Sequence, residues 1–469
     1  MTRIAVIGAG ISGLATAHAI ERLAVPAGLE VDTLVLEKNP RTGGKIWSIR
    51  EEGFLCEWGP NGFLDSKPMT LELCDRLDIR DRLLRSDDNA RKRFIYSERE
   101  LHRLPENGPS FLKSRLISWP GKLRLACEPF LPARRDGVDE TLADFARRRL
   151  GQEALDKLIA PMVSGIFAGD PETMSLQSCF PRIHQLEQEY GGLIRAMIKL
   201  ARQKKAECKA GKAVASAAGP GGILTSFVDG IQELTDCTAA SLRGEVRTGA
   251  AVLAIVRKDG GFELRLADGT TVDAEVVVSA APAYAVADMV AGFDGELKQL
   301  LNEIPYATMN VVCFGYEREK IARDLDGFGY LIPKKEGKSI LGTLWDSSIF
   351  PNRAPEGRVL LRSMMGGATN PGAIALAESE VKARVMVDLK EIMGIGAEPD
   401  FVRIFRHEKA IPQYTVGHSQ RLLALAARHA ATPGLFLTGN AFYGVGLNDC
   451  VHAANQVAGQ VTDFLRERQ

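Results

Sequence analysis

Three glycines near the N-terminus have a spacing that suits the binding of a diphosphate. Gly8, Gly10 and Gly13 directly follow the apolar run 4–7, and the sequence 14–20 after them is compact and helix-forming. In a strand–turn–helix unit of this kind, the first glycine permits the tight turn. The second lets the backbone approach a pyrophosphate, and the third lets helix and strand pack closely. The phosphates then lie at the helix N-terminus, where free N–H groups and the dipole attract negative charge.

An acidic residue after the second predicted strand supports this interpretation. The strand covers 31–36 and is followed by Glu37, which lies 24 residues after Gly13. A carboxylate at about this position binds the ribose hydroxyls of an adenine dinucleotide. No arginine directly follows Glu37 to bind a 2′-phosphate, so the sequence predicts an unphosphorylated ribose.

A second glycine pair distinguishes between two such cofactors. The run Arg41-Thr-Gly43-Gly44 comes soon after Glu37. A glycine pair beside an arginine is typical of FAD proteins with the two-dinucleotide-binding-domain fold, and NAD dehydrogenases lack it. The predicted cofactor is therefore FAD.

The composition excludes several classes of protein. With 469 residues the chain has room for about three domains. Lys+Arg and Asp+Glu both number 59, so no overall charge attracts nucleic acid. The cysteines are scattered without Cys-x-x-Cys spacing, which predicts reduced thiols in a cytoplasmic protein and no metal site. We expect neither a signal peptide nor a membrane-spanning helix, because a strand starts at residue 3 and no apolar run is long enough.

The predicted elements indicate a mixed α/β and α+β protein with a discontinuous first domain. Strands near 251–257, 262–266 and 270–278 are joined by Asp-Gly turns, and a last strand covers 435–440. Such a returning sheet completes a dinucleotide domain. A second, mixed-sheet unit contains strand-like runs at 310–316, 328–332, 340–345 and 359–365 and a helix over 378–393. Helices are also predicted over 71–84, 141–159 and 223–241, with a loop over 160–171 and a linker over 213–222.

Three regions follow from this order. The FAD-binding Rossmann-like domain is expected at 1–70, 213–285 and 405–469, and a substrate-binding domain at 71–95 and 286–404. A helical insertion is expected at 96–212. Its segments 109–135 and 195–212 interleave apolar residues, including Trp119, with lysines and arginines, which suits contact with a lipid surface. A helical subdomain with a solvated basic face would have the same composition, so both interpretations stay open.

A glycine turn opens the last predicted helix. The run Tyr443-Gly-Val-Gly-Leu-Asn448 points backbone N–H groups and a positive helix end at whatever lies there. For a flavin, negative charge develops near such a site on reduction. A simple helix cap is the alternative.

Along nearly its whole length the chain resembles the oxygen-dependent, FAD-containing protoporphyrinogen oxidases and their bacterial relatives that oxidise coproporphyrinogen III. The segments that carry the resemblance are Gly8/Gly10/Gly13, Glu37, Arg41-x-Gly43-Gly44, Glu57-x-Gly59-Pro60, 92–94, Gly165, 168–171, 279–282, 327–331, 341–344, 410–414 and 444–446. Monoamine oxidases and phytoene desaturases share the dinucleotide motifs. The segments 168–171, 327–331, 341–344 and 410–414 are more specific.

The resemblance implies which residues contact FAD. They are Gly8, Gly10, Ile11, Ser12, Gly13, Glu37, Lys38, Arg41, Gly43, Gly44, Gly59, Pro60, Asn61, Val252, Ala280, Gly439, Asn440, Val445, Gly446 and Leu447. The flavin N5 would accept the hydride, and no catalytic acid–base residue is assigned.

The resemblance also implies a substrate and a reaction. A porphyrinogen is a large apolar tetrapyrrole with anionic propionates. Arg93 would pair with a propionate, Leu331 and Leu344 would enclose a pyrrole ring, and the carbonyl of Gly165 would face the pyrrole N–H groups. Met364 would form a wall where the family often has phenylalanine. The implied reaction is a six-electron oxidation by O₂ of protoporphyrinogen IX or coproporphyrinogen III to the porphyrin, with release of H₂O₂, in heme biosynthesis.

Further expectations concern partners and place. The family's helical insertion binds membranes, so we expect a cytoplasmic protein on the cytoplasmic face of the inner membrane. A homodimer and hand-off to the next heme-pathway enzyme stay open, as does the choice between the two porphyrinogens. The alternatives to this function are a flavin amine oxidase, a carotenoid desaturase, or a non-enzymatic binder like the Rab GDP-dissociation inhibitors.

Overall fold

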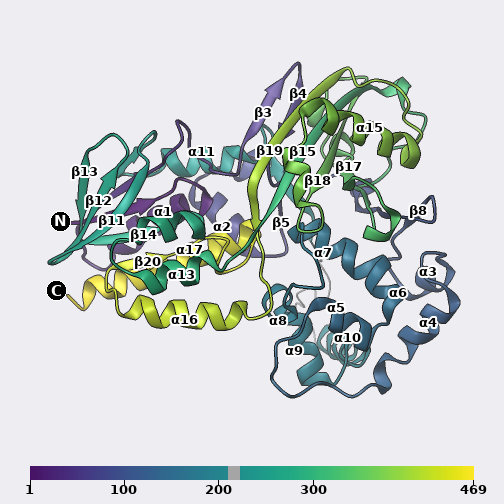
Figure 1. Cartoon of the computed structure of the whole chain (residues 1–469), viewed down its shortest axis with the longest axis horizontal. Coiled ribbons are helices and arrows are strands. Elements are labelled where there is room, and N and C mark those ends of the chain that lie inside the picture. Colours follow the sequence, from purple (N-terminus) through teal and green to yellow (C-terminus); the bar gives the residue numbers. More distant parts are fainter. Residues whose placement is uncertain (210–221, 469) are drawn as a thin grey trace.

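The computed structural model describes residues 1–209 and 222–468. Figure 1 shows a sheet with its helices beside both chain ends, a second sheet region, and a cluster of helices. The stretch expected as a linker, 213–222, lies outside the described residues except for its last position.

A five-stranded parallel sheet lies in the region that contains both chain ends. Its strand order is β10–β2–β1–β14–β20. The strands are β1 (Thr2–Ile7), β2 (Val31–Leu36), β10 (Glu245–Arg247), β14 (Val276–Ser279) and β20 (Leu435–Leu437). Because the strands come from three separated parts of the chain, the expected discontinuous dinucleotide-binding fold is confirmed.

Alternate residues of β1 pack against two different apolar layers. Ile4 and Val6 pack with α1 (Ile11–Ala24) and α17 (Leu447–Arg466). Ala5 and Ile7 face the other layer. That layer contains β11 (Val252–Lys258), β12 (Gly261–Leu266), β13 (Thr271–Ala274), α12 (Ala283–Met289), α13 (Gly295–Asn302) and part of α16 (His418–Ala430). Coverage on both faces explains why the first strand is apolar without interruption.

The three strands β11, β12 and β13 form a separate antiparallel sheet. The predicted Asp-Gly turns are present, with Gly260 and Gly269 both at φ +85°. The run expected as one strand over 270–278 is divided at Glu275, because β13 and β14 belong to different sheets.

A seven-stranded mixed sheet forms the second sheet region. Its order is β19–β15–β18–β17–β16–β7–β8, and only the pair β16–β7 is parallel. The strands are β7 (Arg93–Ser97), β8 (Glu100–Arg103), β15 (Tyr306–Glu317), β16 (Gly329–Leu331), β17 (Ile340–Leu344), β18 (Arg358–Gly366) and β19 (Phe401–Pro412). The predicted helix α15 (Glu378–Met393) packs on one face. The sheet extends past residue 404, because β19 pairs with β15 as far as Pro412.

Two small sheets connect these regions. They are the hairpin β3 (Ser48–Glu51) and β4 (Phe54–Glu57), and the sheet β5 (Phe63–Leu64), β9 (Leu224–Phe227) and β6 (Leu83–Arg85). The helices nearby are α2 (Pro68–Arg76), α11 (Gln232–Ala240) and α14 (Asp346–Ile349).

Two helix predictions are wrong in this part of the chain. The helix expected over 71–84 ends at Arg76, because Asp78 has φ +55° and the chain then enters β6. The helix expected over 223–241 begins only at Gln232, since the preceding residues pair with β5 and β6. Gly230, at φ +100°, makes the turn between strand and helix.

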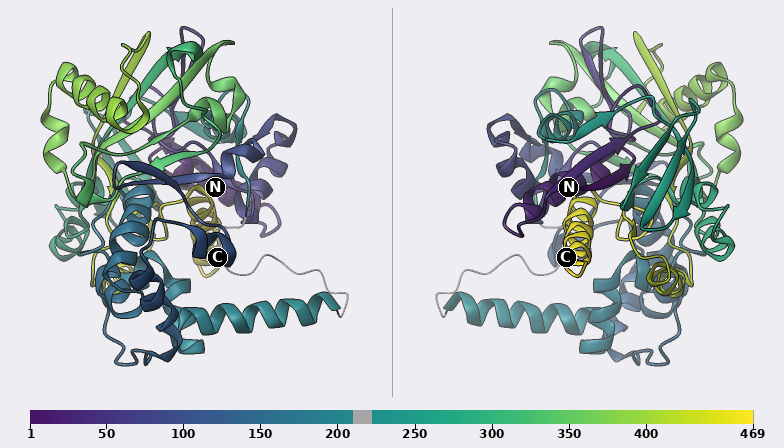
Figure 2. Two further views of the ribbon diagram at one scale, coloured as in Figure 1. Left: turned by 90° about the vertical axis from the view of Figure 1, so that its right-hand side faces the viewer. Right: turned by 90° about the vertical axis from the view of Figure 1, so that its left-hand side faces the viewer.

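The helical insertion contains eight α-helices among its described residues. They are α3 (Gly108–Lys113), α4 (Trp119–Ala126), α5 (Leu142–Arg149), α6 (Gln152–Ala154), α7 (Ala160–Phe167), α8 (Leu176–Cys179), α9 (Pro181–Tyr190) and α10 (Leu193–Lys209). The prediction of a loop over 160–171 is wrong, because α7 occupies most of this segment. Pro161 lies in the first turn, where its missing N–H costs little. In both views of Figure 2, α10 projects away from the rest of the protein.

Candidate functional site

Three chain segments meet at the carboxyl ends of β1, β14 and β20. Gly8 has φ +102°, and a Cβ there would lie 3.4 Å from the carbonyl of Ala280. Gly439 has φ +118°, and a Cβ there would lie 3.8 Å from the Ala280 oxygen and 4.0 Å from Ser12 Oγ. Ligands of parallel α/β sheets bind at this edge. The fold therefore brings these four predicted cofactor residues together.

The start of α1 is open to an anion. Its N-cap, Gly10, makes no side-chain cap, so the first N–H groups of the helix have no intrahelical acceptor. A Cβ on Gly13 would lie 1.9 Å from the Gly8 oxygen, whereas one on Gly10 would meet nothing closer than 3.9 Å. Gly13 is thus required by the packing of helix on strand. Gly10 instead leaves room beside the backbone, as a bound diphosphate needs.

Glu37 lies directly beside this turn and is buried. Its Oε2 accepts a hydrogen bond from Ala9 N–H at 2.8 Å, and its Oε1 accepts one from Asn39 N–H at 2.9 Å. Because Oε1 also accepts from Asn39 Nδ2 at 2.6 Å, the second lone pair of Oε2 is the one left for a ligand hydroxyl. The Glu37 carbonyl accepts from Ala250 N–H, which brings the start of β11, with Val252, to the same side. Lys38 is exposed.

Arg41 shapes its own loop. Its guanidinium donates to the carbonyls of Thr42 at 2.8 Å and Gly44 at 2.9 Å, and it lies 4.3 Å from the ring centroid of Trp47. Gly43 N–H donates to the Ala9 carbonyl at 2.7 Å, so this loop rests against the first glycine turn. Arg41 therefore holds Gly43 and Gly44 in place through backbone carbonyls.

The turn 57–61 lies beside the same loop. A Cβ on Gly59 would lie 2.4 Å from the Lys45 oxygen. Asn61 is buried and donates from Nδ2 to Asp346 Oδ1 at 3.2 Å, while its Oδ1 has no hydrogen-bond partner among the described residues. Pro60 is half-buried. The turn thus has a free amide oxygen, which a ligand N–H or O–H group would satisfy.

The C-terminal glycine turn is the last of the predicted cofactor segments. Its N-cap Gly446 leaves α17 without a side-chain cap, and Leu447 begins the helix. Gly444 has φ +115°, and the half-buried Asn440 and Val445 lie in the same loop. Two uncapped helix ends, those of α1 and α17, therefore lie in the segments predicted to hold the cofactor.

The four predicted substrate side chains lie on one face of the seven-stranded sheet. Arg93 pairs with Gly329, which pairs with Leu344. Two residues further along β16, Leu331 is opposite Gly342, which is opposite Met364. Directly paired residues point to the same side of a sheet, as do residues two apart on one strand. Arg93, Leu331, Leu344 and Met364 hence share a face.

This face is accessible, whereas the opposite one is closed. Leu331, Leu344 and Met364 are half-buried and Arg93 is exposed. Their strand neighbours on the other face, which include Tyr330 and Met365, are buried against α15. The open face therefore differs from a packed core layer and leaves apolar side chains for a ligand.

Helix α7 crosses this open face. A Cβ on Gly165 would lie 3.0 Å from both methyl groups of Leu331. Gly165 is in the last turn of α7, where carbonyls have no intrahelical donor. The structure thus places an exposed backbone acceptor beside the predicted substrate side chains.

Comparison with known proteins identifies the family. Residues 11–462 match the flavin-containing amine oxidoreductases. Coproporphyrinogen III oxidase of Bacillus subtilis is 31% identical, over 98% of this chain and 98% of its own length. Chloroplastic protoporphyrinogen oxidase of Oryza sativa subsp. japonica is 34% identical, over 98% of this chain and 88% of its own length. A solved structure from Exiguobacterium sp. 255-15 aligns with a TM-score of 0.84 at 27% identity and covers 100% of this chain.

This chain belongs to the flavin-containing amine oxidoreductase family. It is an oxidoreductase, its cofactor is FAD, and the resemblance seen in the sequence is confirmed. The residues around the first glycine turn fit FAD, because Gly10 leaves space beside the backbone, α1 has no side-chain cap at its start, and Glu37 lies beside the turn. Among residues 1–209 and 222–468, no three His, Cys, Asp or Glu side chains are grouped to hold a metal ion.

Two sets of residues in this flavoprotein were missed by sequence reasoning. One is a buried charge network of Glu57, Asp346, Arg353 and Arg362. The signal was present, since an arginine interrupts the apolar run of β18. The other is the pair Gln413–Tyr414, which was noted only as part of a motif. His407, on β19, stacks on Trp58 with 4.7 Å between ring centroids.

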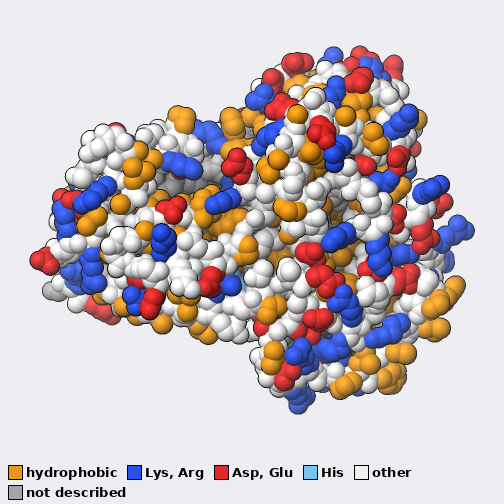
Figure 3. All heavy atoms as spheres, viewed as in Figure 1, with side chains coloured by type: hydrophobic (Ala, Val, Ile, Leu, Met, Phe, Trp, Pro, Cys, Tyr) orange, Lys and Arg blue, Asp and Glu red, His pale blue; other side chains and the backbone are white. Residues whose placement is uncertain are grey.

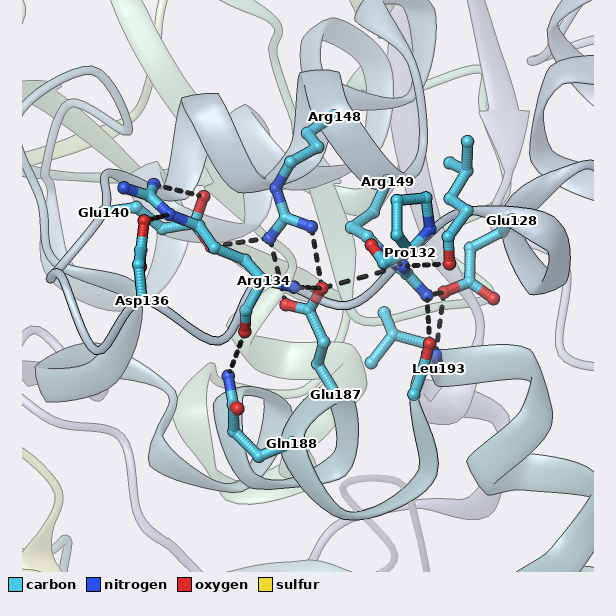
Figure 4. Close-up of polar contacts among 12 residues, drawn as sticks. Glu128, Pro132, Arg134, Asp136, Glu140, Arg148, Arg149, Glu187, Gln188 and Leu193 are labelled. Carbon is cyan, nitrogen blue, oxygen red and sulfur yellow. Dashed lines mark hydrogen bonds and ion pairs between the residues drawn. The ribbon is translucent and has the colours of Figure 1, made fainter.

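A second polar network supports the helical insertion (Figure 4). Arg149 and Glu128, both fully buried, form an ion pair. Glu128 also accepts hydrogen bonds from the first two N–H groups of α10, at 2.8 and 3.0 Å. Arg148 bridges Glu140 and Glu187, each at 2.7 Å. A carboxylate at a helix N-terminus is favoured by the helix dipole. This network therefore fixes the base of α10 to the rest of the insertion.

The insertion exposes apolar side chains. In Figure 3 they gather at the lower right, where Figure 1 places α3 and α4. Trp119 is 66% exposed and Phe130 is 83% exposed. Among the lysines of this region, Lys122 is buried and donates to the carbonyls of Leu112 and Ser114, so it is not available to a headgroup. Among the described residues, no helix is both long and apolar enough to cross a membrane.

Proposed function

We propose that this flavoenzyme oxidises a porphyrinogen with O₂ to the porphyrin, releasing H₂O₂, in heme biosynthesis. The observation that carries the proposal is the row of Arg93, Leu331, Leu344 and Met364 on one open sheet face. A large apolar tetrapyrrole with anionic side chains needs apolar walls and a cation. The names of the relatives from Bacillus subtilis and Oryza sativa support the same chemistry.

The cation of the site is Arg93. Its guanidinium lies 5.2 Å from the ring centroid of Phe328, and no ion pair is formed with any of the described carboxylates. Partial burial lowers the pKa of Arg93, but an arginine side chain stays protonated at neutral pH. An uncompensated cation of this kind is suited to bind a substrate propionate.

The protein orients the tetrapyrrole and excludes water from it. The half-buried leucines and Met364 enclose the rings, and the Gly165 carbonyl accepts hydrogen bonds from pyrrole N–H groups. When bound, FAD supplies the ring that accepts electrons and is reoxidised by O₂. We assign the diphosphate to the turn 8–13 and the ribose to Glu37. The loops 43–44, 59–61 and 439–447 line the rest of the cofactor site.

We assign cofactor binding, substrate binding and membrane docking to different parts of the chain. These are 1–70, 213–285 and 405–469 for FAD, and 71–95 and 286–404 for substrate. Two segments, β8 and the end of β19, are moved to the substrate part from 96–212 and 405–469, because they belong to the seven-stranded sheet. The insertion 96–212 docks to the cytoplasmic face of the inner membrane through its exposed apolar side chains. Both porphyrinogen and porphyrin are poorly soluble, so docking brings the site to them.

The direct test is aerobic incubation of the FAD-loaded protein with protoporphyrinogen IX and coproporphyrinogen III in parallel, followed by porphyrin fluorescence. We expect at least one substrate to be converted to porphyrin faster than by autoxidation. Three molecules of H₂O₂ are expected for each porphyrin formed. If neither substrate reacts while simple amines yield H₂O₂, the amine oxidase alternative is correct. A protein that stays colourless when FAD is added would be a non-enzymatic binder.

A further inference from the structure

One short segment contacts three loops around the proposed site. It comprises residues 409–414, at the end of β19 and directly after it. The Lys45 ammonium, beside the Gly43–Gly44 pair, donates to the Lys409 carbonyl at 2.7 Å. Gln413 Nε2 donates to the Phe167 carbonyl at the end of α7 at 2.8 Å. The Tyr414 hydroxyl forms hydrogen bonds with the loop that contains the C-terminal glycine turn. The segment therefore joins both cofactor-side loops to the substrate-side helix.

The Tyr414 hydroxyl joins two backbone groups of the C-terminal loop. It donates to the Asn440 carbonyl at 2.5 Å and accepts from Gly444 N–H at 2.9 Å. These groups belong to the chain between β20 and α17. The hydroxyl is buried, so neither bond is replaced easily by one to water. The two bonds link Asn440 to Gly444 through the hydroxyl and so fix the backbone between them.

Tyr414 is itself held firmly by the rest of the protein. Its ring stacks on the buried ring of His418, with centroids 4.2 Å apart and planes inclined by 11°. Its carbonyl accepts a hydrogen bond from Ser175 N–H at 2.9 Å. Its backbone and ring thus have fixed positions. The hydroxyl can transmit that position to the backbone of the loop at Asn440 and Gly444.

The loop needs such support. Gly444 has φ +115°, and Tyr443 beside it is 48% exposed. The Gly446 N-cap provides no side chain to order the start of α17. If the loop is not ordered beforehand, a ligand that binds it must supply the ordering free energy, and its apparent affinity falls.

We propose that Tyr414 is a positioning residue for the flavin. Its hydroxyl holds residues 440–444 in the conformation that receives the cofactor, and the adjacent Gln413 holds the end of α7 in register with that loop. The pair 413–414 thus couples the cofactor side of the site to its substrate side. This inference rests on the proposed function only for α7, because the effect on FAD requires no porphyrinogen.

The test compares Tyr414→Phe with Tyr190→Phe in the full chain. Phenylalanine keeps the ring stacked on His418 and removes only the hydroxyl. We expect the FAD dissociation constant of Tyr414→Phe to rise about tenfold, the effect of losing one to two net hydrogen bonds. Its flavin absorption spectrum and reduction potential are expected to shift as well. Tyr190→Phe, which removes a hydroxyl from α9 in the helical insertion and outside the cofactor site, is expected to match the wild type in all three.

Two further variants separate positioning from packing. His418→Phe keeps an aromatic ring against Tyr414 and leaves both hydroxyl bonds, so its FAD affinity is expected to be unchanged. Gln413→Leu is expected to raise the KM for porphyrinogen while the FAD spectrum stays that of the wild type. Thermal unfolding of each apoprotein shows that the variants are folded.

Three results would each contradict part of the proposal. Wild-type FAD affinity and reduction potential in Tyr414→Phe would show that the hydroxyl does not position the loop. An equal loss of affinity in His418→Phe would assign the effect to ring packing, and an unchanged KM in Gln413→Leu would remove the link to α7. Failure of the wild type to oxidise either porphyrinogen would refute the proposed function and leave the FAD measurements valid.

Discussion

The carboxylate of Glu57 lies 3.1 Å from the guanidinium of Arg353, and both side chains are fully buried. A second buried pair, Asp346 and Arg362, lies beside it at 2.9 Å. Arg362 also donates to the carbonyls of Glu57 at 3.1 Å and Gly59 at 3.0 Å. Burial raises the pKa of Glu57 and of Asp346, while the arginines oppose that rise. The network thus anchors the turn 57–61 to the seven-stranded sheet.

Arg353→Leu is expected to destabilise the protein by about 3–5 kcal/mol, because it leaves the Glu57 carboxylate buried without its cation. The measurement is the free energy of unfolding from chemical denaturation. Arg80→Ala is the control, since it breaks an exposed pair with Asp75 and should cost less than about 1 kcal/mol. Equal effects of the two substitutions would show that the buried pair contributes nothing beyond a surface pair.

Glu37→Gln is expected to weaken FAD binding by about 10- to 100-fold, which is the effect of losing a charged acceptor for the ribose hydroxyls. The amide oxygen of glutamine still accepts from Ala9 N–H, so the fold should persist. Titration of the apoprotein with FAD measures the dissociation constant. Asp32→Asn, on β2 just before Glu37 and paired with Arg3, serves as the control and should bind FAD as the wild type does.

Arg93→Ala is expected to raise the KM for porphyrinogen by about 10- to 100-fold, because a charge-assisted hydrogen bond contributes about 1.5–3 kcal/mol. FAD content and spectrum should not change. Steady-state kinetics with porphyrin fluorescence provide the measurement. Arg91→Ala removes a nearby exposed arginine that pairs with Asp88 and should leave KM unchanged. An unaltered KM in Arg93→Ala would exclude the propionate assignment.

His418 is expected to make the protein less stable at acidic pH. Burial, with a smaller contribution from Arg421, lowers the pKa of His418 to about 4 from its ordinary 6.5. Between these values the unfolded chain binds a proton that the folded chain does not. The contribution of His418 to the free energy of unfolding is therefore fully present above pH 6.5. It is lost as the pH is lowered towards 4, by about 3 kcal/mol at most.

The measurement is unfolding free energy at pH 7 and pH 4 for the wild type and for His418→Phe. The substitution removes the titrating group and keeps the ring, so the loss of stability on acidification should be smaller in the variant. An identical loss in both proteins would assign the acid sensitivity to other groups.

Replacement of Trp119 and Leu123 by serine is expected to reduce binding to anionic lipid vesicles by at least about tenfold, because each apolar side chain contributes about 1.5–3 kcal/mol when removed from water. Co-sedimentation with vesicles measures the binding. Leu423→Ser changes a residue on α16 that is 72% exposed and lies outside the insertion, so it is the control. Membrane docking by the insertion is wrong if the double variant binds like the wild type.

Local patterns predicted the cofactor and the first strand–turn–helix unit correctly. Glycine spacing, an acidic residue after a strand and apolar strand runs depend on neighbours in sequence, so they were readable before the fold was known. The second sheet was predicted in outline, with α15 correct at both bounds. The errors at 71–84 and 223–241 arose where a single left-handed residue or strand pairing overrode local helix preference. At 160–171 the helix forms because Pro161 lies in its first turn, where a proline is compatible with a helix.

Relationships between distant residues required the folded chain. No local pattern shows that Arg93 and Leu344 face the same side as Met364, because strand register sets that across four strands. The same holds for Glu57 with Arg353 and for Tyr414 with Gly444, whose contacts depend on which loops meet. The glycine turns and Glu37 thus follow from the amino-acid order, since a backbone cradle is a local structure. The sheet face that holds Arg93, Leu331, Leu344 and Met364 exists only once sheets and helices have packed, because these side chains are far apart in sequence.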